Sequence, residues 1–300
     1  MEKNLCRLLR ETLPGLTVQE GEPMSRHCSF RIGGPAAAFA RVTTESDAAA
    51  LLALLRREGV PFAVIGRGSN LLVSDAGFPG AVICLSDNPD SLRREGDCVS
   101  AWAGVTLARL AAFARDQGLA GLEFAHGIPG SLGGGVLMNA GAYGGELKDV
   151  VVSVRYLDAE GALRETQEPG FAYRRSRFSG SGEIVLGATL RLRPDDPAAI
   201  GARMAELMEK RSASQPLDLP SAGSAFKRPA TGYAAAMIDG AGCKGLTVGG
   251  AQVSEKHAGF VVNRGGATAA DVCALMAEVQ RRVLEKYGVE LEPEVRFLGA

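Results

Sequence analysis

Residues 127–145 read GIPGSLGGGVLMNAGAYGG, and eight of these nineteen residues are glycine. A flexible linker of similar glycine content is rich in serine and lacks large apolar residues, whereas this stretch contains Ile128, Leu132, Val136, Leu137 and Met138. Those apolar side chains must be packed. Glycine lets a ligand approach the backbone closely and tolerates positive φ angles. The stretch therefore favours a ligand cradle over a merely tight crossing of two elements.

The chain has 300 residues, which suggests two domains that can each bury a core. With 46% hydrophobic and 22% charged residues, its composition is that of an ordinary globular protein. Lysine and arginine total 33, and aspartate and glutamate total 34. This balance gives no reason to expect nucleic acid or an anionic membrane as the main partner, but a small anionic ligand needs only a few local donors.

The N-terminal residues MEKNLCRLLRETLPG contain no apolar run long enough for a secretory signal, and no other window is long enough to cross a membrane. We therefore expect a cytoplasmic protein. The six cysteines form no C-x-x-C pair, and the three histidines lack the spacing of metal ligands. We expect reduced, mostly buried thiols and no metal ion.

Helices and strands are interspersed along the first part of the chain, which predicts an α+β or mixed α/β fold. Thr44, with Asp47 three residues on, is the expected N-cap of a helix that ends at Gly59. A short strand is predicted over residues 62–65. A second helix is predicted from Thr106 to Gly118, and residues 150–166 alternate as a hairpin with its turn at 158–161.

Residues 191–199, RLRPDDPAA, are the best candidate for a domain boundary because they are rich in proline and aspartate. We expect one domain over residues 1–195 and a second over residues 196–300. The following helix, residues 198–211, has an apolar face formed by Ile200, Met204, Leu207 and Met208. Residues 248–263 are predicted to form strands, and a long helix is expected from Thr268, capped with Asp271, to Gly288.

Residues 66–70, GRGSN, directly follow the predicted strand at 62–65, where exposed backbone N–H groups can bind a phosphate. The start matches G-x-G-x-x-G, but Leu71 occupies the third glycine position, and LLVSDAGF predicts a strand and turn rather than a helix. A Rossmann site is therefore disfavoured. Taken alone, residues 66–70 are as well explained by a tight turn as by a phosphate-binding loop. The second cradle, residues 127–145, favours the phosphate-binding loop.

Three arginines flank Tyr173 in FAYRRSRF, namely Arg174, Arg175 and Arg177. Such a run is usually a solvated basic face, although the planar guanidinium group also suits a carboxylate or phosphate. In AGSAFKRP, no G-x-S-x-G elbow surrounds Ser224, so a hydrolase nucleophile is not indicated.

Three acids, Glu290, Glu292 and Glu294, alternate in ELEPEVRF near the C-terminus. We expect a terminal strand there, with these acids on one charged face and with Pro293 and Val295 toward the core.

Seven motifs, taken in order, resemble one family, the UDP-N-acetylenolpyruvoylglucosamine reductases of bacterial peptidoglycan synthesis. They span nearly the whole chain and read SFRIGGPA, VIGRGSNLLV, GIPGSLGGGVLMNAGAYGGE, YRRSRF, AGSAFKRP, GLTVGGAQVSEKHAGFVVN and LEPEVRF. The chain resembles the compact class of this family, because its C-terminal half has no evident tyrosine-bearing insertion.

The resemblance implies an α+β fold with a flavin-binding domain of the vanillyl-alcohol-oxidase (PCMH) type, built of two small α+β subdomains, and a C-terminal α+β substrate-binding domain. It implies NADPH-dependent reduction of UDP-N-acetylglucosamine enolpyruvate to UDP-N-acetylmuramate through noncovalent FAD. We expect a monomer.

The resemblance also assigns residues. Arg174 matches the arginine that binds the enolpyruvyl carboxylate, Ser224 the proton donor, and Glu294 the acid that works with the arginine. The positions implied for FAD are Gly66, Arg67, Gly68, Ser69, Asn70, Leu71, Ile128, Pro129, Gly130, Ser131, Gly133, Gly134, Asn139, Ala140 and Gly141. The positions implied for substrate are Tyr173, Lys227, Arg228, Gln252 and Asn263.

Some positions depart from the family pattern. Cys28 stands where a threonine is common, and Arg228 stands where many relatives have asparagine. His126 precedes the glycine stretch, and in some oxidases of the wider superfamily a histidine is bonded to flavin. Two alternatives stay open: a flavin oxidase that uses oxygen would keep the cradles without needing all three catalytic residues, and a nucleotide-binding module would need no catalysis.

Overall fold

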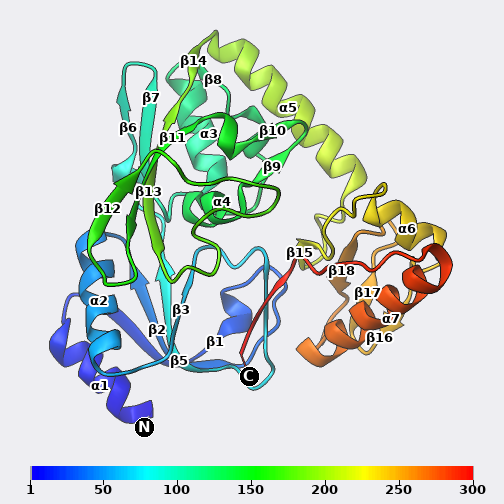
Figure 1. Cartoon of the computed structure of the whole chain (residues 1–300), viewed down its shortest axis with the longest axis horizontal. Helices are drawn as coiled ribbons and strands as arrows, with labels where there is room; N and C mark the ends of the chain where they lie inside the picture. The colour runs from blue at the N-terminus through cyan, green and yellow to red at the C-terminus, as the bar shows by residue number, and fades with distance from the viewer. Residues whose placement is uncertain (1, 300) are drawn as a thin grey trace. The chain divides into compact units, whose positions relative to one another are not determined.

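The structure, a computed structural model, describes residues 2–299, with side chains from residue 5 onward (Figure 1). Its contacts divide the chain into two compact units, and each is described by itself. The first unit consists of Met1–Glu20, Ala38–Arg67 and Gly80–Arg211. The second consists of Gly21–Ala37, Gly68–Pro79 and Ser212–Ala300. The second unit therefore gathers segments that are far apart in the sequence.

The first unit contains a five-stranded antiparallel sheet of order β12-β11-β13-β7-β6. Its strands are β6 (Arg93–Glu95), β7 (Cys98–Trp102), β11 (Val151–Leu157), β12 (Leu163–Thr166) and β13 (Ile184–Arg191). Strands β11 and β12 form the predicted hairpin, with Leu157 opposite Leu163 and with the Asp158 N–H donating to the Ala162 carbonyl at 3.0 Å. The turn prediction is confirmed.

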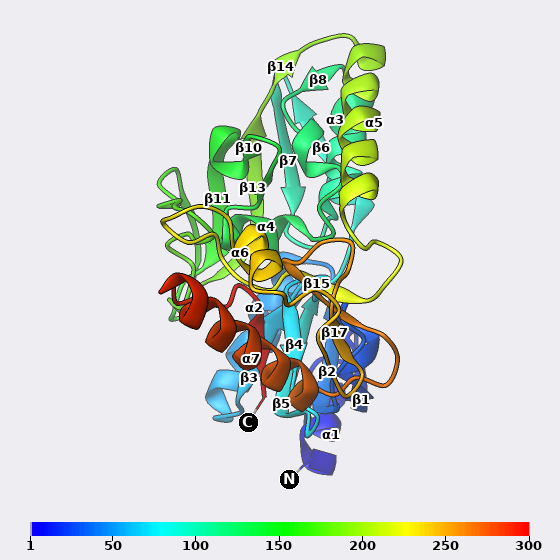
Figure 2. The same cartoon turned by 90° about the vertical axis from the view of Figure 1, so that its right-hand side faces the viewer.

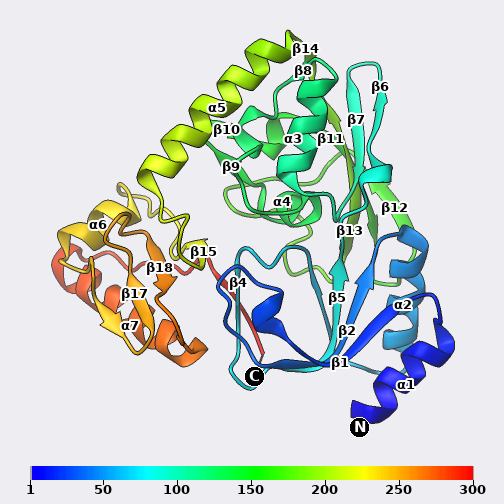
Figure 3. The same ribbon diagram turned by 180° about the vertical axis from the view of Figure 1, so that it is seen from behind.

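A four-stranded sheet of order β1-β2-β5-β3 supports two N-terminal helices. These elements are α1 (Glu2–Thr12), β1 (Thr17–Pro23), β2 (Pro35–Val42), α2 (Glu45–Arg57), β3 (Phe62–Ile65) and β5 (Phe78–Leu85). Figure 3 shows α1 and α2 next to each other. Leu9 of α1 and Leu52 of α2 share a buried cluster with Ala40 and Ile83 of the sheet. The predicted cap of α2 is confirmed, because Thr44 Oγ1 accepts from the Asp47 N–H at 3.1 Å.

Two further helices of the first unit are α3 (Leu107–Asp116) and α5 (Pro197–Ser214). The predicted start of this helix at Thr106 is confirmed, and Thr106 Oγ1 caps α3 by accepting from the Arg109 N–H at 3.1 Å. Helix α5 runs beside α3 (Figure 2), and a Cβ on Gly201 would lie 3.6 Å from Arg115 Cδ. The helix is longer than predicted at both ends, and Met208 is exposed rather than buried.

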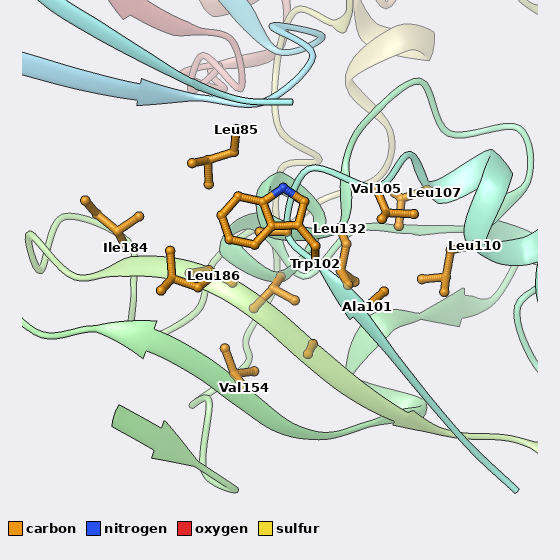
Figure 4. Packing of buried hydrophobic residues seen from close by; sticks show 14 of the residues in the cluster. Leu85, Ala101, Trp102, Val105, Leu107, Leu110, Leu132, Val154, Ile184 and Leu186 are labelled. Carbon is orange, nitrogen blue, oxygen red and sulfur yellow. The ribbon is translucent and has the colours of Figure 1, made fainter. Parts of the chain in front are cut away.

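The core of the first unit surrounds Trp102 (Figure 4). Its ring packs among Leu85, Ile184 and Leu186, and its Nε1–H donates to the Ser86 carbonyl at 2.9 Å. Leu132 is fully buried in the same cluster. Because Leu132 begins α4 (Leu132–Met138), the core fixes the middle of the glycine-rich stretch.

Short elements complete the first unit. They are η2 (Pro89–Ser91), β8 (Leu119–Ala120), η3 (Glu123–Ala125), β9 (Gly141–Ala142), β10 (Gly145–Glu146), η4 (Leu147–Asp149) and β14 (Arg193–Pro194). Strand β8 pairs with β14, and β9 pairs with β10.

The second unit contains an antiparallel sheet of order β15-β18-β17-β16 with two helices (Figure 1). These elements are β15 (Ser221–Ser224), α6 (Ala234–Gly240), β16 (Thr247–Val248), β17 (Ala251–Val253), β18 (Phe260–Asn263) and α7 (Ala269–Tyr287). Helix α7 buries Val272, Leu275 and Val279 in the core of this unit. Thr268 and Asp271 form the predicted capping box at its start.

A separate pair of parallel strands in the second unit joins β4 (Leu71–Val73) to β19 (Arg296–Leu298). The preceding 3-10 turn η1 (Met24–Arg26) also belongs to this unit. The predicted strand and turn after residue 70 are therefore present, and the α+β class is confirmed.

Four of the six cysteines are buried, and no disulfide joins any of them. Burial raises the pKa of the Cys28 and Cys84 thiols, so both favour the protonated form. Within residues 2–299, no helix has both the length and the apolar run needed to cross a membrane. The same residues contain no cluster of three His, Cys, Asp or Glu side chains suited to a metal ion.

Candidate functional site

The first glycine-rich loop, residues 66–70, follows β3 as predicted. A Cβ on Gly66 would lie 2.1 Å from the Oγ of Ser131, in the second glycine-rich stretch. Gly68 has a φ of +60°, and a Cβ there would lie 2.2 Å from the His27 carbonyl oxygen. Gly68 therefore requires glycine, whereas a side chain at position 66 would displace the Ser131 hydroxyl, so Gly66 lies directly against the second stretch.

The glycines of the second stretch do two different things. A Cβ on Gly133 would meet the Ala103 side chain at 2.8 Å, and one on Gly135 would meet Leu147 Cδ1 at 2.9 Å. These two glycines let α4 pack closely. Gly134 is exposed, and a Cβ there would meet only Ser131 Oγ, at 3.8 Å. The side of α4 at Gly134 is therefore bare backbone beside the Gly66 contact.

Backbone hydrogen bonds fix the second stretch where it enters α4. The Gly130 carbonyl accepts from the Leu107 N–H at 2.9 Å, and the Leu132 N–H donates to the Val105 carbonyl at 2.8 Å. Ser131, between them, is buried. Ile128 packs partly buried against the core of the first unit.

Asn139 ends α4 in the left-handed region, with a φ of +43°. Its Nδ2 donates to Glu146 Oε2 at 2.6 Å and to the Ala172 carbonyl at 3.2 Å, and its Oδ1 accepts from the Lys148 N–H at 3.0 Å. The buried amide thus joins the glycine-rich stretch to residue 172. Sequence reasoning missed Glu146, although a glutamate that closes NAGAYGGE is the available signal.

Tyr173 and Arg174 form the tip of a tight turn in which Ala172 and Arg175 pair through both backbone groups. Arg174 has a φ of +55°, which is unusual for a side chain of its size. Its Nη1 lies 3.5 Å from the Gly141 carbonyl, and its guanidinium group lies 5.3 Å from the Tyr173 ring centre. The second glycine-rich stretch therefore contacts Arg174 directly.

The three arginines of this segment have different surroundings. Arg175 is exposed, and Arg177 pairs with Glu183 at 2.6 Å. Arg174 is half-buried. The run is therefore not a uniform solvated face.

Two serines, missed by sequence reasoning, hold this segment on α4. Ser176 and Ser179 each donate to the Leu137 carbonyl at 3.0 Å. The S-x-x-S spacing was the signal that could have revealed them.

Ser224 ends β15, opposite Phe260, in the second unit. The next residue, Ala225, accepts from the Glu294 N–H at 2.9 Å. The Glu294 carbonyl in turn accepts from Asn70 Nδ2 at 3.0 Å. The structure thus brings the backbones of two predicted catalytic residues, Ser224 and Glu294, side by side. Arg174 belongs to the first unit.

The predicted terminal strand was wrong in its extent. Strand β19 begins only at Arg296, and Pro293 makes an isolated bridge with Phe226. Pro293 is exposed, whereas Leu291 is fully buried and Val295 packs against the core. Residues 289–295 therefore lack the regular strand that was expected to place the three acids on one face.

The acids of this segment also differ in their surroundings. Glu290 and Glu292 are exposed, and Glu294 is half-buried. Glu292 forms an ion pair with Lys227, whose N–H donates to the Glu292 carbonyl at 2.8 Å.

The positions implied for substrate differ in how many contacts their side chains already make within the protein. Arg228 stacks on the exposed Tyr233 ring, with its guanidinium carbon 4.0 Å from the ring centre. Gln252 Nε2 donates to Thr247 Oγ1 at 3.1 Å. Buried Asn263 donates to the Phe30 carbonyl at 3.1 Å and accepts from two backbone N–H groups, so its amide supports the fold of the second unit.

His126 lies at the start of the glycine-rich stretch. Its Nδ1 is buried and has no hydrogen-bond partner among the described residues. The neighbouring Gly127 lies against Arg211, because a Cβ there would be 3.1 Å from Arg211 Cδ. Burial lowers the pKa of Arg211.

Two sequence families match the chain. Residues 36–167 match the family described as an FAD binding domain, and residues 215–298 match UDP-N-acetylenolpyruvoylglucosamine reductase, C-terminal domain. Both glycine-rich segments fall within the first match.

Curated relatives are similar over nearly their full length. A protein named UDP-N-acetylenolpyruvoylglucosamine reductase from Caldanaerobacter subterraneus subsp. tengcongensis is 46% identical, covering 100% of this chain and 99% of the relative. One of the same name from Heliobacterium modesticaldum is 48% identical, covering 93% and 90%. The crystal structure of the Thermus caldophilus reductase matches with a TM-score of 0.79 and 36% identity, covering 94% and 99%.

Proposed function

The chain belongs to the UDP-N-acetylenolpyruvoylglucosamine reductase family, and we propose that Arg174, Ser224 and Glu294 carry its reaction. It is a flavin-dependent oxidoreductase with a flavin-binding domain of the vanillyl-alcohol-oxidase type. It reduces UDP-N-acetylglucosamine enolpyruvate to UDP-N-acetylmuramate with NADPH, in the synthesis of the peptidoglycan precursor.

The glycine-rich segments fit FAD. Gly66 lies against Ser131, and the bare backbone of Gly134 leaves room on the same side of α4. When bound, FAD would supply the hydride-transfer chemistry between NADPH and the enolpyruvyl double bond. We propose that the backbone of residues 66–71, 128–134 and 139–141 holds the cofactor, because main-chain N–H groups can replace water around its phosphates.

Arg174 is proposed to bind the enolpyruvyl carboxylate. As a hydride adds to the terminal carbon of the double bond, negative charge collects on the neighbouring carbon and its carboxylate. A fixed guanidinium group stabilises that charge without having to reorganise. The contact with Gly141 and the left-handed backbone of the turn hold Arg174 in place.

Ser224 is proposed to donate the proton that completes the reduction. One hydride from NADPH and one proton then convert the double bond into a single bond. A serine hydroxyl is a weak acid, but the carbon that receives the proton is a strong base, so the transfer is feasible within hydrogen-bond reach. Glu294 is proposed to work with Arg174 at the substrate carboxylate.

The observation that carries this assignment is the 2.9 Å hydrogen bond from the Glu294 N–H to the Ala225 carbonyl. It joins the segments of two proposed catalytic residues that are far apart in the sequence.

Stopped-flow mixing under anaerobic conditions tests the function. We expect NADPH to bleach the flavin and UDP-N-acetylglucosamine enolpyruvate to restore its colour. Reoxidation by oxygen but not by that substrate would instead indicate an oxidase, and no bleaching by NADPH would indicate a binding module.

The remaining assignments are proposals of a coarser kind. We propose that residues 1–195 hold the flavin and that residues 196–300 hold most of the substrate. This division follows the ligand that each part binds. Tyr173, Lys227, Arg228, Gln252 and Asn263 stay candidates for substrate contacts, directly or through the backbone that they support. We propose that the chain acts in the cytoplasm as a monomer, which sedimentation of the flavin-loaded protein would test.

A further inference from the structure

The C-terminal segment that carries Glu294 runs between two other segments of the second unit. On one side, the Glu294 N–H donates to the Ala225 carbonyl at 2.9 Å and the Lys227 N–H donates to the Glu292 carbonyl at 2.8 Å. On the other side, β19 pairs with β4 from Arg296 and Leu71 onward. The position of Glu294 is therefore set by residues 70–73 as well as by residues 225–227.

Asn70 extends the second of these pairings by one step. Its carbonyl accepts from the Arg296 N–H at 2.9 Å, which continues the ladder of β4 and β19. Its side chain then supplies a donor where the ladder has ended, because Nδ2 lies 3.0 Å from the Glu294 carbonyl. Both backbone groups of Glu294 are thus hydrogen-bonded, one to Ala225 and one to Asn70.

We propose that Asn70 is a positioning residue for Glu294, and that it acts through the Glu294 carbonyl. The inference rests on the proposed function, in which Glu294 works at the reacting carboxylate. The Glu294 side chain leaves the backbone between two fixed peptide groups, so its direction depends on both. Removing the Asn70 donor frees one of them.

Asn70 also has a second connection. It directly follows residues 66–69, which form the turn that we assign to the cofactor. The same residue therefore ends the cofactor loop and supports the acid.

Gln280 provides a matched comparison on the same segment. Its Nε2 donates to the Leu291 carbonyl at 2.8 Å, three residues before Glu294. The two amides make the same kind of bond to the same stretch of chain, but only Asn70 bonds the residue proposed to act in the reaction. Loss of either bond should lower stability, since a carbonyl loses its donor.

The test compares Asn70→Asp with Gln280→Glu in protein saturated with FAD. Each change keeps the shape of the side chain and removes the donor. We expect Asn70→Asp to slow flavin reoxidation by the enolpyruvyl substrate about 10- to 100-fold, the scale of effects from small misplacements of reacting groups. The half-saturating substrate concentration and the rate of NADPH reduction should change little.

Gln280→Glu should lower the melting temperature and leave both half-reactions unchanged. If Asn70→Asp does not fold, Asn70→Ala replaces it, because this change removes the donor without adding charge. We expect Asn70→Ala also to slow reoxidation by the substrate while leaving reduction by NADPH nearly unchanged. Bound-flavin absorbance and melting temperature are measured for every variant. Equal slowing of both half-reactions, or slowing that disappears when FAD is raised, would overturn the proposal.

A double-variant cycle with Glu294→Gln decides whether Asn70 acts through Glu294. We expect Asn70→Asp to add no further slowing in the Glu294→Gln background, because coupled residues are not additive. If the two changes instead slow reoxidation independently, so that their fold-effects multiply, the role of Asn70 is overturned while that of Glu294 stands. Normal reoxidation in Glu294→Gln itself would overturn the proposed role of Glu294 and this inference with it.

Discussion

Asn70 and Glu294 lie 224 positions apart in the chain, and the side-chain amide of Asn70 donates a 3.0 Å hydrogen bond to the Glu294 carbonyl. Asn139 makes a similar bond in the first unit, where its amide donates to the Ala172 carbonyl at 3.2 Å, two residues before Arg174. In each unit, an asparagine of a glycine-rich segment supports the segment of a proposed catalytic residue.

Ser224→Ala should separate the two halves of the reaction. Reduction of the flavin by NADPH needs no proton from Ser224, so we expect it to stay nearly intact. Reoxidation by the enolpyruvyl substrate should slow roughly 100- to 10,000-fold, the usual contribution of a general acid. Anaerobic stopped-flow absorbance measures both. Ser221→Ala, on the same strand, is the control that should leave both rates unchanged; equal slowing of both halves in Ser224→Ala would indicate a structural role.

Arg174→Lys should be a poor replacement. A lysine keeps the charge but loses the planar pair of donors, so we expect kcat/KM to fall by an amount on the order of 2–4 kcal/mol in transition-state stabilisation. Steady-state kinetics with varied enolpyruvyl substrate provide the measurement. The exposed Arg175 supplies the control, Arg175→Lys, which should behave like the parent protein. Near-normal turnover of Arg174→Lys would remove Arg174 from the site.

Asn139→Asp should destabilise the first unit. The new carboxylate would face Glu146 Oε2, now 2.6 Å from Nδ2, and would lose the bond to Ala172. We expect a loss of about 1–3 kcal/mol in the free energy of unfolding, as for a buried group left without its partner. Urea unfolding followed by circular dichroism measures it. Asn88→Asp is the comparison, since this half-buried residue keeps its cap as aspartate and loses only one exposed bond from Nδ2 to the Thr43 carbonyl, so its loss of stability should be much smaller.

The bound flavin should leave the denatured chain. The cofactor is expected to be noncovalent, so acid or heat should precipitate the protein and leave the yellow colour in solution. His126→Ala should not change the released fraction. Flavin that stays with the pellet, together with a mass increase on a peptide containing His126 or a cysteine, would contradict this expectation.

Asp271 should make stability depend on pH at the acid end. Hydrogen bonds from the Thr268 N–H, and then from the Gly250 N–H, hold the pKa of its carboxyl below the ordinary value of 3.8. The ionised group therefore stabilises the fold above pH 3.8, and this contribution is lost as the pH falls through the lower folded-state pKa. The difference in melting temperature between the parent and Asp271→Asn should shrink on acidification below 3.8. A difference that stays constant with pH would refute the assignment.

Local features of the fold could be predicted from the sequence because neighbouring residues decide them. The caps at Thr44 and Thr268 depend on residues three positions away, and both were predicted correctly. The pairing of Leu71 with Arg296 could not be predicted, since no local pattern encodes a partner so distant in sequence. The same limit explains the error over residues 289–295, where Pro293 bridges the distant Phe226 and lies exposed instead of facing the core.

The candidate site could be located from the sequence, but the sequence did not show which of its residues serve packing and which are open to a ligand. A run of glycines does not reveal that Gly133 and Gly135 serve packing while Gly134 leaves open backbone. The amide of Asn139 looks equally available to a cofactor until Glu146, Lys148 and Ala172 are seen around it. Those distinctions depend on which neighbours fill the space, and that is a property of the packed chain.

The parallel pairing of β4 with β19 bears on how this protein is made. Leu71 leaves the ribosome long before Arg296, its partner in the strand pair. The first unit has all of its segments once Arg211 has been synthesised, whereas the second cannot close its last pairing until translation reaches residue 298. Residues 21–37 and 68–79 are synthesised before their final partners. Segments that stay unpaired during synthesis are prone to start aggregation. Fast synthesis of the last residues, or a chaperone near the exit tunnel, should therefore improve the folding of the second unit more than that of the first.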